Sequence, residues 1–435
     1  MSTITAAEPI QSPEQNRKTV ISWALYDWAN TAFALTVISA FFPLFLKQYW
    51  SAGTDATAST LQLGLANSAA SIVVALVAPV LGAIADRGSS KKGYLAAFTA
   101  LAVVTTAALA LVGRGDWPWA VAMFVVASIG FSAANIFYDA LIVSVAQGKH
   151  LHYVSALGFG LGYLGGGLLF ALNVAMTLWP ERFGLADSTQ AVRVSFVMVA
   201  AWWVVFSVPL LVFVREPAGP STHGVCRVVR EGLRQFAATF RHVRNLREVW
   251  LFLLAYWLYI DGVYTIARMA LDYGMALGFD PKSLIVALLI TQFVGFPAAL
   301  AFGYAGERFG AKPAIFVSIG TYAGVTVCSY AMTEVWEFYA LATVIGLVQG
   351  AVQSLSRSLY AQIIPTAQAG EFFGFYNMAG KFATVLGPLL MGITASLTGS
   401  SRVAILTILI LFVVGAALLC LVREGDNQPF PNRHG

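Results

Sequence analysis

Apolar stretches long enough to cross a membrane alternate with short polar segments along almost the whole chain. A helix needs about 20 predominantly apolar residues to span a hydrocarbon core of ~30 Å. Runs of this size occupy residues 20–46, 61–85, 94–113, 118–146, 152–178, 192–214, 249–276, 284–306, 313–332, 336–364, 372–397 and 403–422. The pattern predicts an all-α membrane protein with twelve transmembrane helices, in which the separation near 332–336 is the weakest.

The composition agrees with lipid as the surrounding medium. Of the 435 residues, 58% are hydrophobic and 11% are Asp, Glu, Lys or Arg, whereas about a quarter of an average soluble domain is charged. The three cysteines, Cys226, Cys328 and Cys420, lie far apart and predict neither a disulfide framework nor a zinc site. The sequence contains no HExxH, GxSxG or Walker motif, so it favours neither an enzyme nor an ATP-driven pump, and no cofactor is expected.

Positive charges fall mainly on one side of the predicted membrane. With the N-terminus in the cytoplasm, most of the 26 Lys and Arg residues lie on cytoplasmic segments, which favours two cytoplasmic termini. The predicted division is a tail over 1–19, a bundle over 20–214, a basic linker over 215–248, a bundle over 249–422 and a tail over 423–435. The linker has amphipathic helical spacing and is interpreted as a topology anchor on anionic lipid or, alternatively, as a regulatory segment. The short tails favour the inner (cell) membrane of a bacterium.

An internal repeat divides the predicted helices into two equivalent halves. GAIADRGSSKK (82–92) and GYAGERFGAKP (303–313) align at one constant offset, which pairs Gly82 with Gly303, Asp86 with Glu307 and Arg87 with Arg308. The same offset carries residues 146–147 onto 367–368, three predicted helix ends later. Two parallel repeats of six helices are typical of carriers that bind solute near the midplane of the membrane.

The repeated segment resembles the loop motif between the second and third helices of the major facilitator superfamily, which has a weaker copy between the eighth and ninth. A narrower resemblance, to the vacuole-effluxer-like branch, rests on SWALYDWANTAF (22–33), YIDGVYT (259–265), GLVQGAVQSLSRSLYAQIIP (346–365) and EFFGFYNMAGK (371–381). The resemblance implies the major facilitator fold, with two pseudo-symmetric six-helix bundles and transport by alternating access. Fungal members of the branch are described as amino-acid effluxers.

The two loop copies supply six candidate gating residues: Gly82, Asp86, Arg87, Gly303, Glu307 and Arg308. Gly82 lets another backbone come close, and the Asp86 carboxylate suits the positive end of the helix that begins near 371–373. Because that contact forms only when the cytoplasmic ends of the halves meet, we expect Asp86→Asn to favour the inward-open state. Solvation of Asp86 and membrane anchoring by the basic residues are the alternatives.

Charged residues inside predicted helices need a partner or a function, because an isolated charge in hydrocarbon is strongly destabilising. Three groups are candidates for substrate binding or proton coupling: Asp27 with Tyr26 and Asn30, Asp261 with Tyr259, and Lys381 with Tyr376 and Asn377. Asp27 and Asp261 lie on the first helix of each half, so symmetry predicts that they face each other across a central cavity. The alternative is a buried Asp paired with Arg or with backbone amides at a helix break.

Three further features complete the predicted interior. Asp139 and Arg357 occupy nearly equivalent places in the fourth and tenth helices and predict a gate pair, with substrate contact or snorkelling as alternatives. Arg268 is spaced for an i, i+4 pair with Asp272. The segment GFGLGYLGGG (158–167) predicts close helix packing, since it lacks the lysine of a nucleotide-binding loop.

Carboxylates in both halves and cations in the second half suit a zwitterion, or an anion that moves with a proton. We therefore expect a secondary active transporter that moves a small polar solute, an amino acid or a small organic anion, by alternating access with proton coupling. A multidrug-type exporter of lipophilic compounds and a non-transporting receptor with the carrier fold are the alternatives. The expected partners are the solute, protons and membrane lipids, with a monomeric chain and no nucleic acid.

Overall fold

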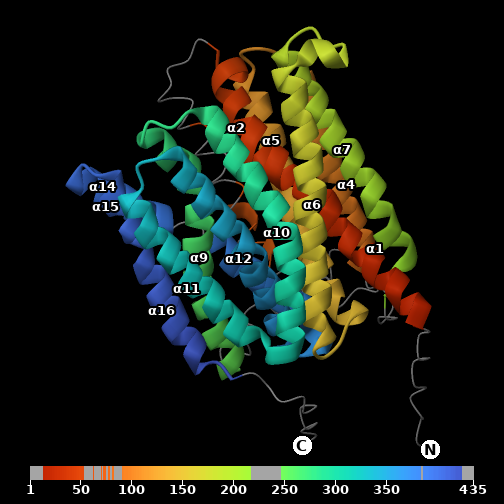
Figure 1. Ribbon diagram of the computed structural model, residues 1–435. Helices are drawn as coiled ribbons and strands as arrows, with labels where there is room; N and C mark the ends of the chain where they lie inside the picture. The colour runs from red at the N-terminus through yellow and green to blue at the C-terminus, as the bar shows by residue number, and fades with distance from the viewer. Residues whose placement is uncertain are drawn as a thin grey trace, which may run out of the picture.

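The structure is a computed structural model that describes residues 13–52, 62, 70, 72–74, 77–78, 81–82, 91–216, 246–383 and 386–423 (Figure 1). Within these residues, eleven helices are long and apolar enough to cross a membrane. They correspond to eleven of the twelve predicted spans, and the remaining one, 61–85, lies mostly outside the described residues. The predicted all-α membrane architecture is confirmed.

The described part of the first half contains five spanning helices. The first span is continuous through α1 (Pro13–Ala32), the π-helical η1 (Phe33–Phe41), α2 (Phe42–Phe45) and the π-helical η2 (Leu46–Trp50). The others are α4 (Lys91–Ala108) with its 3-10 extension η3 (Leu109–Leu111), α5 (Trp117–Val145), α6 (His150–Leu178) and, after the short η4 (Pro180–Phe183), α7 (Ser188–Phe213). π-helical turns are frequent at functional sites, and η1 lines the central cavity described below.

The described part of the second half contains six spanning helices. Four are single helices, namely α9 (Arg247–Ala276), α10 (Pro281–Phe309), α11 (Ala311–Ala331) and α12 (Val335–Ile363). After η5 (Thr366–Gln368), each of the last two spans contains two described helices: α13 (Ala369–Phe382) and α14 (Leu386–Thr398), then α15 (Ser401–Leu406) and α16 (Ile408–Leu421).

The weak separation near 332–336 is a true helix boundary. Glu334 is the N-cap residue of α12, and the Glu337 carboxylate accepts hydrogen bonds from the backbone amides of Thr333 and Glu334 at 2.7 and 2.8 Å. This reciprocal capping box satisfies amides that the first turn of a helix leaves without partners. A gap of only three residues therefore suffices to end α11 and to begin α12.

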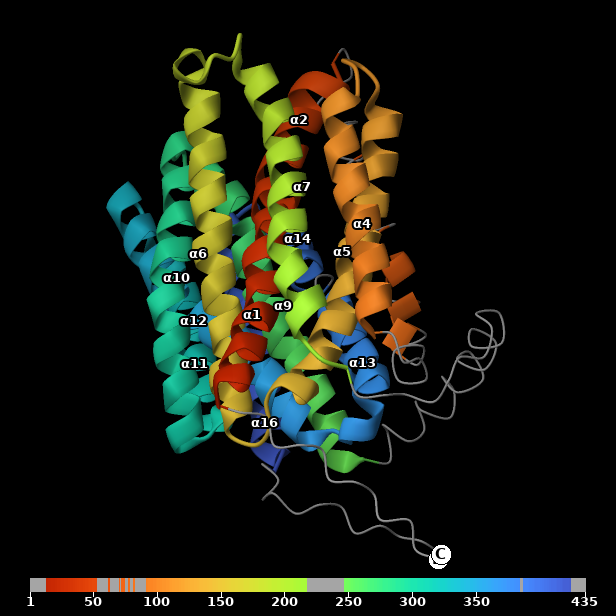
Figure 2. The ribbon, with the colours of Figure 1, turned by 90° about the vertical axis from the view of Figure 1, so that its right-hand side faces the viewer.

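The helices run side by side in two bundles (Figures 1 and 2). Along the line where the halves meet, α6 of the first half packs against α10 and α12 of the second. The start of α1 and the end of α16 lie at the same end of the molecule, the predicted cytoplasmic end (Figure 1). The boundaries of the bundles, linker and tails stay a prediction, since residues 217–245 lie outside the described part of the chain.

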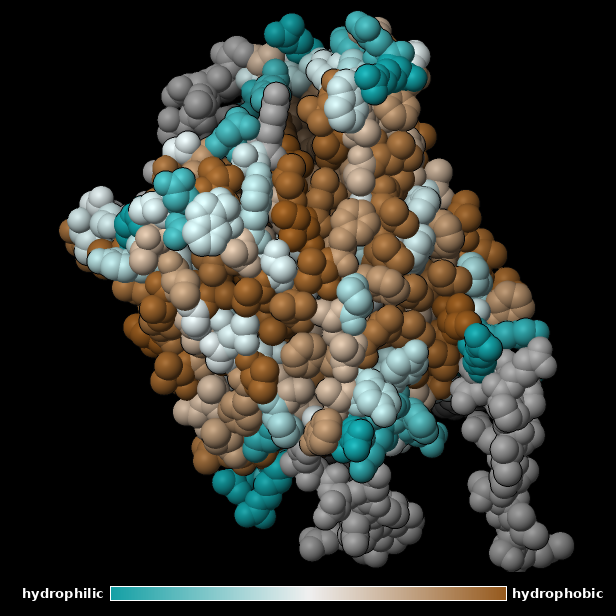
Figure 3. Space-filling model, in the orientation of Figure 1, coloured by the Kyte–Doolittle hydropathy of each residue, from teal (hydrophilic) through white to brown (hydrophobic). Residues whose placement is uncertain are grey.

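The outer surface is apolar over the middle of the molecule, as Figure 3 shows for one face. Valine side chains on four different helices, Val104, Val205, Val317 and Val413, are between 58% and 65% exposed. Exposure of so much apolar area to water is unfavourable, whereas lipid accommodates it. The chain is an integral membrane protein.

The glycine-rich segment of α6 allows helices on two sides to approach closely. An added Cβ at Gly165 would meet the Trp28 ring of α1, and one at Gly160 would meet Phe296 of α10. In lipid, such close contacts between small residues hold helices together, because the hydrophobic effect does not. α6 therefore connects α1 to the second half.

Candidate functional site

A cavity of about 1530 Å³ lies between the two halves. Toward the predicted external end, its wall is formed by residues near helix ends: Tyr49, Trp179, Ser188, Leu284, Met332 and Phe338. At the opposite end, its lining includes Asp27, Asp139 and Arg357. Pockets that enclose a small ligand usually measure about 300–1,000 Å³. The larger volume fits an open vestibule that extends from the predicted external end to a charged floor.

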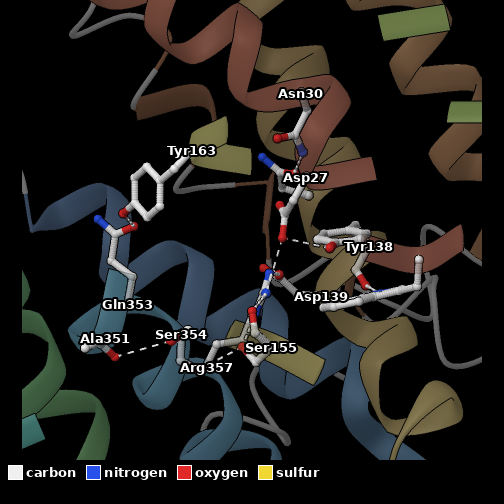
Figure 4. A network of polar contacts seen from close by, with 12 residues as sticks. Asp27, Asn30, Tyr138, Asp139, Ser155, Tyr163, Ala351, Gln353, Ser354 and Arg357 are labelled. Carbon is white, nitrogen blue, oxygen red and sulfur yellow. Dashed lines mark hydrogen bonds and ion pairs between the residues drawn. The ribbon is translucent and has the colours of Figure 1, made fainter. Parts of the chain in front are cut away.

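Arg357 of α12 forms that floor by binding two carboxylates of the other half (Figure 4). Its Nη2 lies 3.3 Å from Oδ2 of Asp27, and its Nη1 lies 3.2 Å from Oδ1 of Asp139. Arg357 Nε also donates to the Ser155 hydroxyl at 2.9 Å, and Nη2 donates to the Ser155 carbonyl at 3.0 Å. All three charged residues are buried, and charges away from water require this kind of pairing and hydrogen bonding.

Aromatic rings surround the same guanidinium group. Its central carbon lies 4.3 Å from the ring centroid of Phe159, 4.9 Å from that of Trp23 and 5.5 Å from that of Tyr138. Cation–π contacts of this kind add about 0.5–2 kcal/mol each, depending on desolvation. The three rings come from α6, α1 and α5, so the first half alone provides the aromatic environment.

The two carboxylates are held differently. Asp27 also accepts a hydrogen bond from the Tyr138 hydroxyl at 2.8 Å, a contact within the first half. Asp139 accepts one from the Asn377 side chain at 3.0 Å, and Asn377, like Arg357, belongs to the second half. Separation of the halves would therefore leave Asp27 with Tyr138 but remove both of these partners from Asp139.

Polar contacts continue between the halves toward the predicted cytoplasmic end. The Ser155 hydroxyl donates to the Ser354 carbonyl at 2.8 Å, and His152 Nδ1 lies 2.7 Å from the Ser358 hydroxyl. Gln362 donates to the Gly148 carbonyl at 2.9 Å, and its amide nitrogen lies 3.1 Å from His152 Nε2. These contacts join the start of α6 to the end of α12, so the described helices are closed together below the cavity floor.

The described loop-motif candidates lie at this closed end. Gly82 is buried against the other half, and an added Cβ there would meet the carbonyl group of Gly370 and the Cα of Glu371. Glu307 Oε1 lies 3.1 Å from His150 Nδ1 of the first half. Gly303 packs against Ala156 of α6, and Arg308 lies exposed over the Phe309 ring; Asp86 and Arg87 fall outside the described residues.

Asp261 does not face Asp27, and the prediction from symmetry is wrong for this residue. Its carboxylate accepts hydrogen bonds from the backbone amides of Leu386 and Gly387 at 3.0 and 2.9 Å and from the Thr265 hydroxyl at 3.1 Å. It is fully buried and absent from the cavity lining. The carboxylate therefore accepts hydrogen bonds from amides at the first described residues of α14, in keeping with the alternative of a buried Asp paired with backbone amides.

Two tyrosines predicted for the binding site also lie behind its wall. The Tyr259 hydroxyl lies 2.6 Å from the Ser356 hydroxyl, and the Tyr26 hydroxyl lies 2.8 Å from that of Thr99. Both tyrosines are 0% exposed and absent from the cavity lining. The prediction that they contact the solute is wrong, because the rotation of each helix turns them away from the cavity, and they are packing residues.

The cavity wall of the second half is polar and aromatic. Lys381, Tyr376 and Asn377 of α13 line it, as predicted, and Arg268 of α9 lines it as well. The Tyr376 ring stacks on that of Tyr256 at 4.3 Å between centroids. The sequence predicts a local pair of Arg268 with Asp272 and gives no sign that Arg268 lines the cavity. The Asp272 side chain lies outside the described part of the chain.

Other members of the floor were also missed by sequence reasoning. Asn135 of α5 lines the cavity and accepts a hydrogen bond from Asn30 at 2.8 Å, and Tyr138 and Ser155 hold the charged network. Asn135 and Tyr138 lie one turn apart on one face of α5, and this spacing of polar residues inside a membrane helix could have indicated the site. Ser155 carried none, because serine is common in membrane helices.

Comparisons with known proteins cover nearly the whole chain. A family model described as "Vacuole effluxer Atg22 like" matches residues 15–427. The "Uncharacterized MFS-type transporter YxiO" of Bacillus subtilis (strain 168) is 40% identical over 405 residues, which are 93% of this chain and 94% of that protein. Autophagy-related protein 22 of Yarrowia lipolytica is 25% identical over 298 residues, which are 62% of this chain but only 50% of the fungal protein.

A solved structure has the same fold. The proton:xylose symporter XylE, bound to 6-bromo-6-deoxy-D-glucose, superimposes with a TM-score of 0.73 at 15% sequence identity. The match covers 95% of this chain and 97% of XylE. At this identity the likeness shows the fold alone, which is that of the major facilitator superfamily.

Proposed function

The chain belongs to the vacuole effluxer Atg22-like family of transporters with the major facilitator fold, and from this premise we propose its substrate class and its coupling. The family and the fold are those of secondary transporters and not of enzymes. We propose that the chain moves a small polar solute, an amino acid or a small organic anion, by alternating access coupled to protons.

One observation carries the proposal: the cavity ends at a buried charge network that bridges the halves. Arg357 from one half binds Asp27 and Asp139 from the other, directly at the cavity floor. For buried ion pairs, the Coulomb attraction and the lost hydration nearly cancel. Such a network can therefore hold the gate closed and still be broken when a solute or a proton competes for one of its members.

Asp139 is the proposed site of proton binding. Two carboxylates share one guanidinium group, so the network has a formal excess of one negative charge when both are ionised. Both described side-chain partners of Asp139, Arg357 and Asn377, belong to the second half and leave when the halves part. A proton on Asp139 would remove the excess charge, weaken the ion pair and compensate for the lost partners.

The residues of the cavity wall favour a polar solute as the substrate. Amide side chains, including Asn30, Asn135 and Gln349, line the cavity together with the cations Arg268 and Lys381. These groups can hydrogen-bond a carboxylate and the polar atoms next to it, while the aromatic residues contact an apolar side chain. The same aromatic residues would also suit a lipophilic compound, which remains the competing substrate class.

Flux through proteoliposomes tests the proposal. Purified protein would be offered labelled amino acids, mono- and dicarboxylates, sugars and lipophilic cations, with and without an imposed proton gradient. We expect uptake of an amino acid or organic anion that increases with the gradient, and we expect Asp139→Asn to lose this gradient-driven increase. The exposed Asp116, at the start of α5, offers Asp116→Asn as a matched control that should retain uptake.

The other outcomes of this assay each contradict the proposal. Flux of lipophilic compounds alone would establish the exporter, and saturable binding without flux of any compound would establish a receptor.

Two further expectations belong to the proposal: both termini lie in the cytoplasm at a bacterial inner membrane, and the chain acts as a monomer. Reporter fusions at each terminus and the mass of the detergent-solubilised particle test them.

A further inference from the structure

The guanidinium group of Arg357 occupies a complete cation-binding box that belongs to the opposite half. The box consists of two carboxylates, Asp27 and Asp139, the rings of Trp23, Tyr138 and Phe159, and the hydroxyl and carbonyl oxygens of Ser155. Every one of these groups lies on α1, α5 or α6. Negative charge, aromatic faces and hydrogen-bond acceptors together are the environment that proteins use to bind organic cations.

Contacts within the first half hold the box in shape without Arg357. The Trp23 indole N–H donates to the Tyr138 carbonyl at 3.2 Å, and the two rings stack at 4.5 Å between centroids. The Tyr138 hydroxyl donates to Asp27 at 2.8 Å, and the Tyr26 ring packs on Tyr138 at 4.9 Å. Removal of Arg357 would therefore leave most of the site preformed, which reduces the ordering cost of binding another cation.

Alternating access removes Arg357 from the box. Arg357 lies on α12 of the second half, and the contacts below it join α6 to α12. Parting of the halves at this end would withdraw the guanidinium group and leave Asp27, and Asp139 whenever it holds no proton, without it inside the membrane. Unpaired charges there are strongly unfavourable, so a replacement cation would stabilise the opened state.

We propose that the box binds a monovalent organic cation, a guanidinium or primary ammonium group, when the halves are open at the predicted cytoplasmic end. In the state described here, Arg357 displaces that cation and acts as a tethered competitor. The inference rests on the proposed function only in requiring that the chain alternates between the two states. It assigns a ligand class to the inward-open state and a means of expelling the ligand from the outward-open one.

The exchange has a thermodynamic consequence that distinguishes it from an ordinary salt bridge. A ligand that binds only when Arg357 is out of the box has an apparent affinity equal to its intrinsic affinity multiplied by the fraction of molecules in which the box is vacant. Deletion of the Arg357 charge should therefore strengthen binding of a small cation, whereas deletion of a normal binding residue weakens it. The same ligand should shift the wild-type population toward the inward-open state.

Binding of methylguanidinium to Arg357→Ala is the first test. The probe is methylguanidinium chloride at millimolar concentration, with sodium chloride at equal ionic strength as reference, and the readout is the thermal unfolding of the detergent-solubilised full chain. We expect a saturable rise in the unfolding midpoint, with an apparent affinity at least ~10-fold tighter than in the wild type. Arg357→Lys keeps a tethered cation and should show no gain, and Asp27→Asn combined with Arg357→Ala should lose it.

Two results of this test would overturn the proposal. One is the absence of a saturable rise in Arg357→Ala. The other is an equal rise in the double variant, because the cation would then bind somewhere other than the box. If Arg357→Ala does not yield folded protein, the wild-type population shift decides instead.

Thiol accessibility measures that shift. Ser358 is 0% exposed and follows Arg357 on α12, on the side of the predicted cytoplasmic end, so a cysteine there reports opening of that end. In a chain whose native cysteines are replaced, methylguanidinium should accelerate modification of Ser358→Cys and should have no effect when Asp27→Asn is added. An unchanged or slower modification rate in the Asp27-containing protein would overturn the proposal.

Failure of this inference is distinguishable from failure of the proposed function. If the proteoliposomes carry an amino acid or organic anion but methylguanidinium has neither effect, the tethered-competitor role is wrong and the transport proposal stands. If no solute is carried although methylguanidinium binds Arg357→Ala, the cation box is real and the transport proposal is wrong.

Discussion

Gly82 offers the sharpest perturbation of the closed gate, because its neighbour across the interface is backbone. An ideal Cβ at this position would lie 2.9 Å from the Gly370 carbonyl carbon and 3.0 Å from the Cα of Glu371, with the Gly370 oxygen nearer still. A flexible side chain could rotate away from a methyl group, but the start of α13 cannot. Gly82→Ala therefore forces the two halves apart at this contact.

The expected magnitude follows from the geometry. Insertion of one methyl group into a packed contact destabilises by about 1–3 kcal/mol when the surroundings must shift. The penalty applies to the closed state alone, since the contact joins the two halves and disappears when they separate. With about 2 kcal/mol, the ratio of inward-open to outward-open molecules should rise by about 30-fold.

Cysteine accessibility is the appropriate assay, and the chain supplies a matched control. In a background with the native cysteines replaced, Ser358→Cys should be modified far faster in Gly82→Ala than in the parent. Gly324→Ala makes the same chemical change on α11, where an added Cβ meets no heavy atom within 4 Å. It should leave the modification rate unchanged.

The reasoning would be refuted by equal modification rates in Gly82→Ala and Gly324→Ala. It would also be refuted if Gly82→Ala raised the rate only in proportion to a general loss of thermal stability. In that case the contact stabilises the whole fold and does not bias one state.

Three further substitutions separate structural, gating and coupling roles. Asp261→Ala removes the acceptor of one buried and one partly buried amide, so thermal unfolding should show a loss of about 2 kcal/mol with solute affinity unchanged. Reduced affinity would return Asp261 to the binding site. His152→Ala removes the contact with Ser358, so the predicted cytoplasmic end should open more often. A dye-labelled cysteine at the exposed Lys149 should report that opening, and an unaltered signal would speak against a latch. Asp139→Asn leaves a balanced pair of one carboxylate with one guanidinium group, so folding and solute exchange should persist while proton-driven accumulation is lost; retained accumulation would exclude Asp139 as the proton site.

Most spanning helices could be predicted because their signal is local. A window of about 20 apolar residues identifies a span whatever it packs against, and even the narrow boundary at Glu334 is set by a local capping box. The end of α13 at Phe382 was not predictable in this way, since the apolar run 372–397 continues past it. The amides of Leu386 and Gly387, at the first described residues of α14, bind Asp261, more than a hundred residues earlier in the chain.

The candidate site was predictable only in part, because rotation about the helix axis is not local. The pseudo-equivalent positions of Asp139 and Arg357 suggested a pair, and in the structure Nη1 of Arg357 lies 3.2 Å from Oδ1 of Asp139. Symmetry gave Asp261 the correct helix but the wrong face. Asp27 was expected to face a solute, whereas in this state it also binds Arg357, a contact between residues 330 positions apart that depends on how the halves dock.

The most direct test of the account is to measure access to the two sides of the charge network in one protein. Gln349 lines the cavity above Arg357, and the fully buried Ser358 lies below it. Cysteines at these positions would be modified separately by a membrane-impermeant reagent in oriented vesicles, first without and then with Gly82→Ala. Alternating access through the Asp27–Asp139–Arg357 network predicts that modification at 349 falls as modification at 358 rises. Rates that rise together, or that do not respond, would contradict a gate at this network.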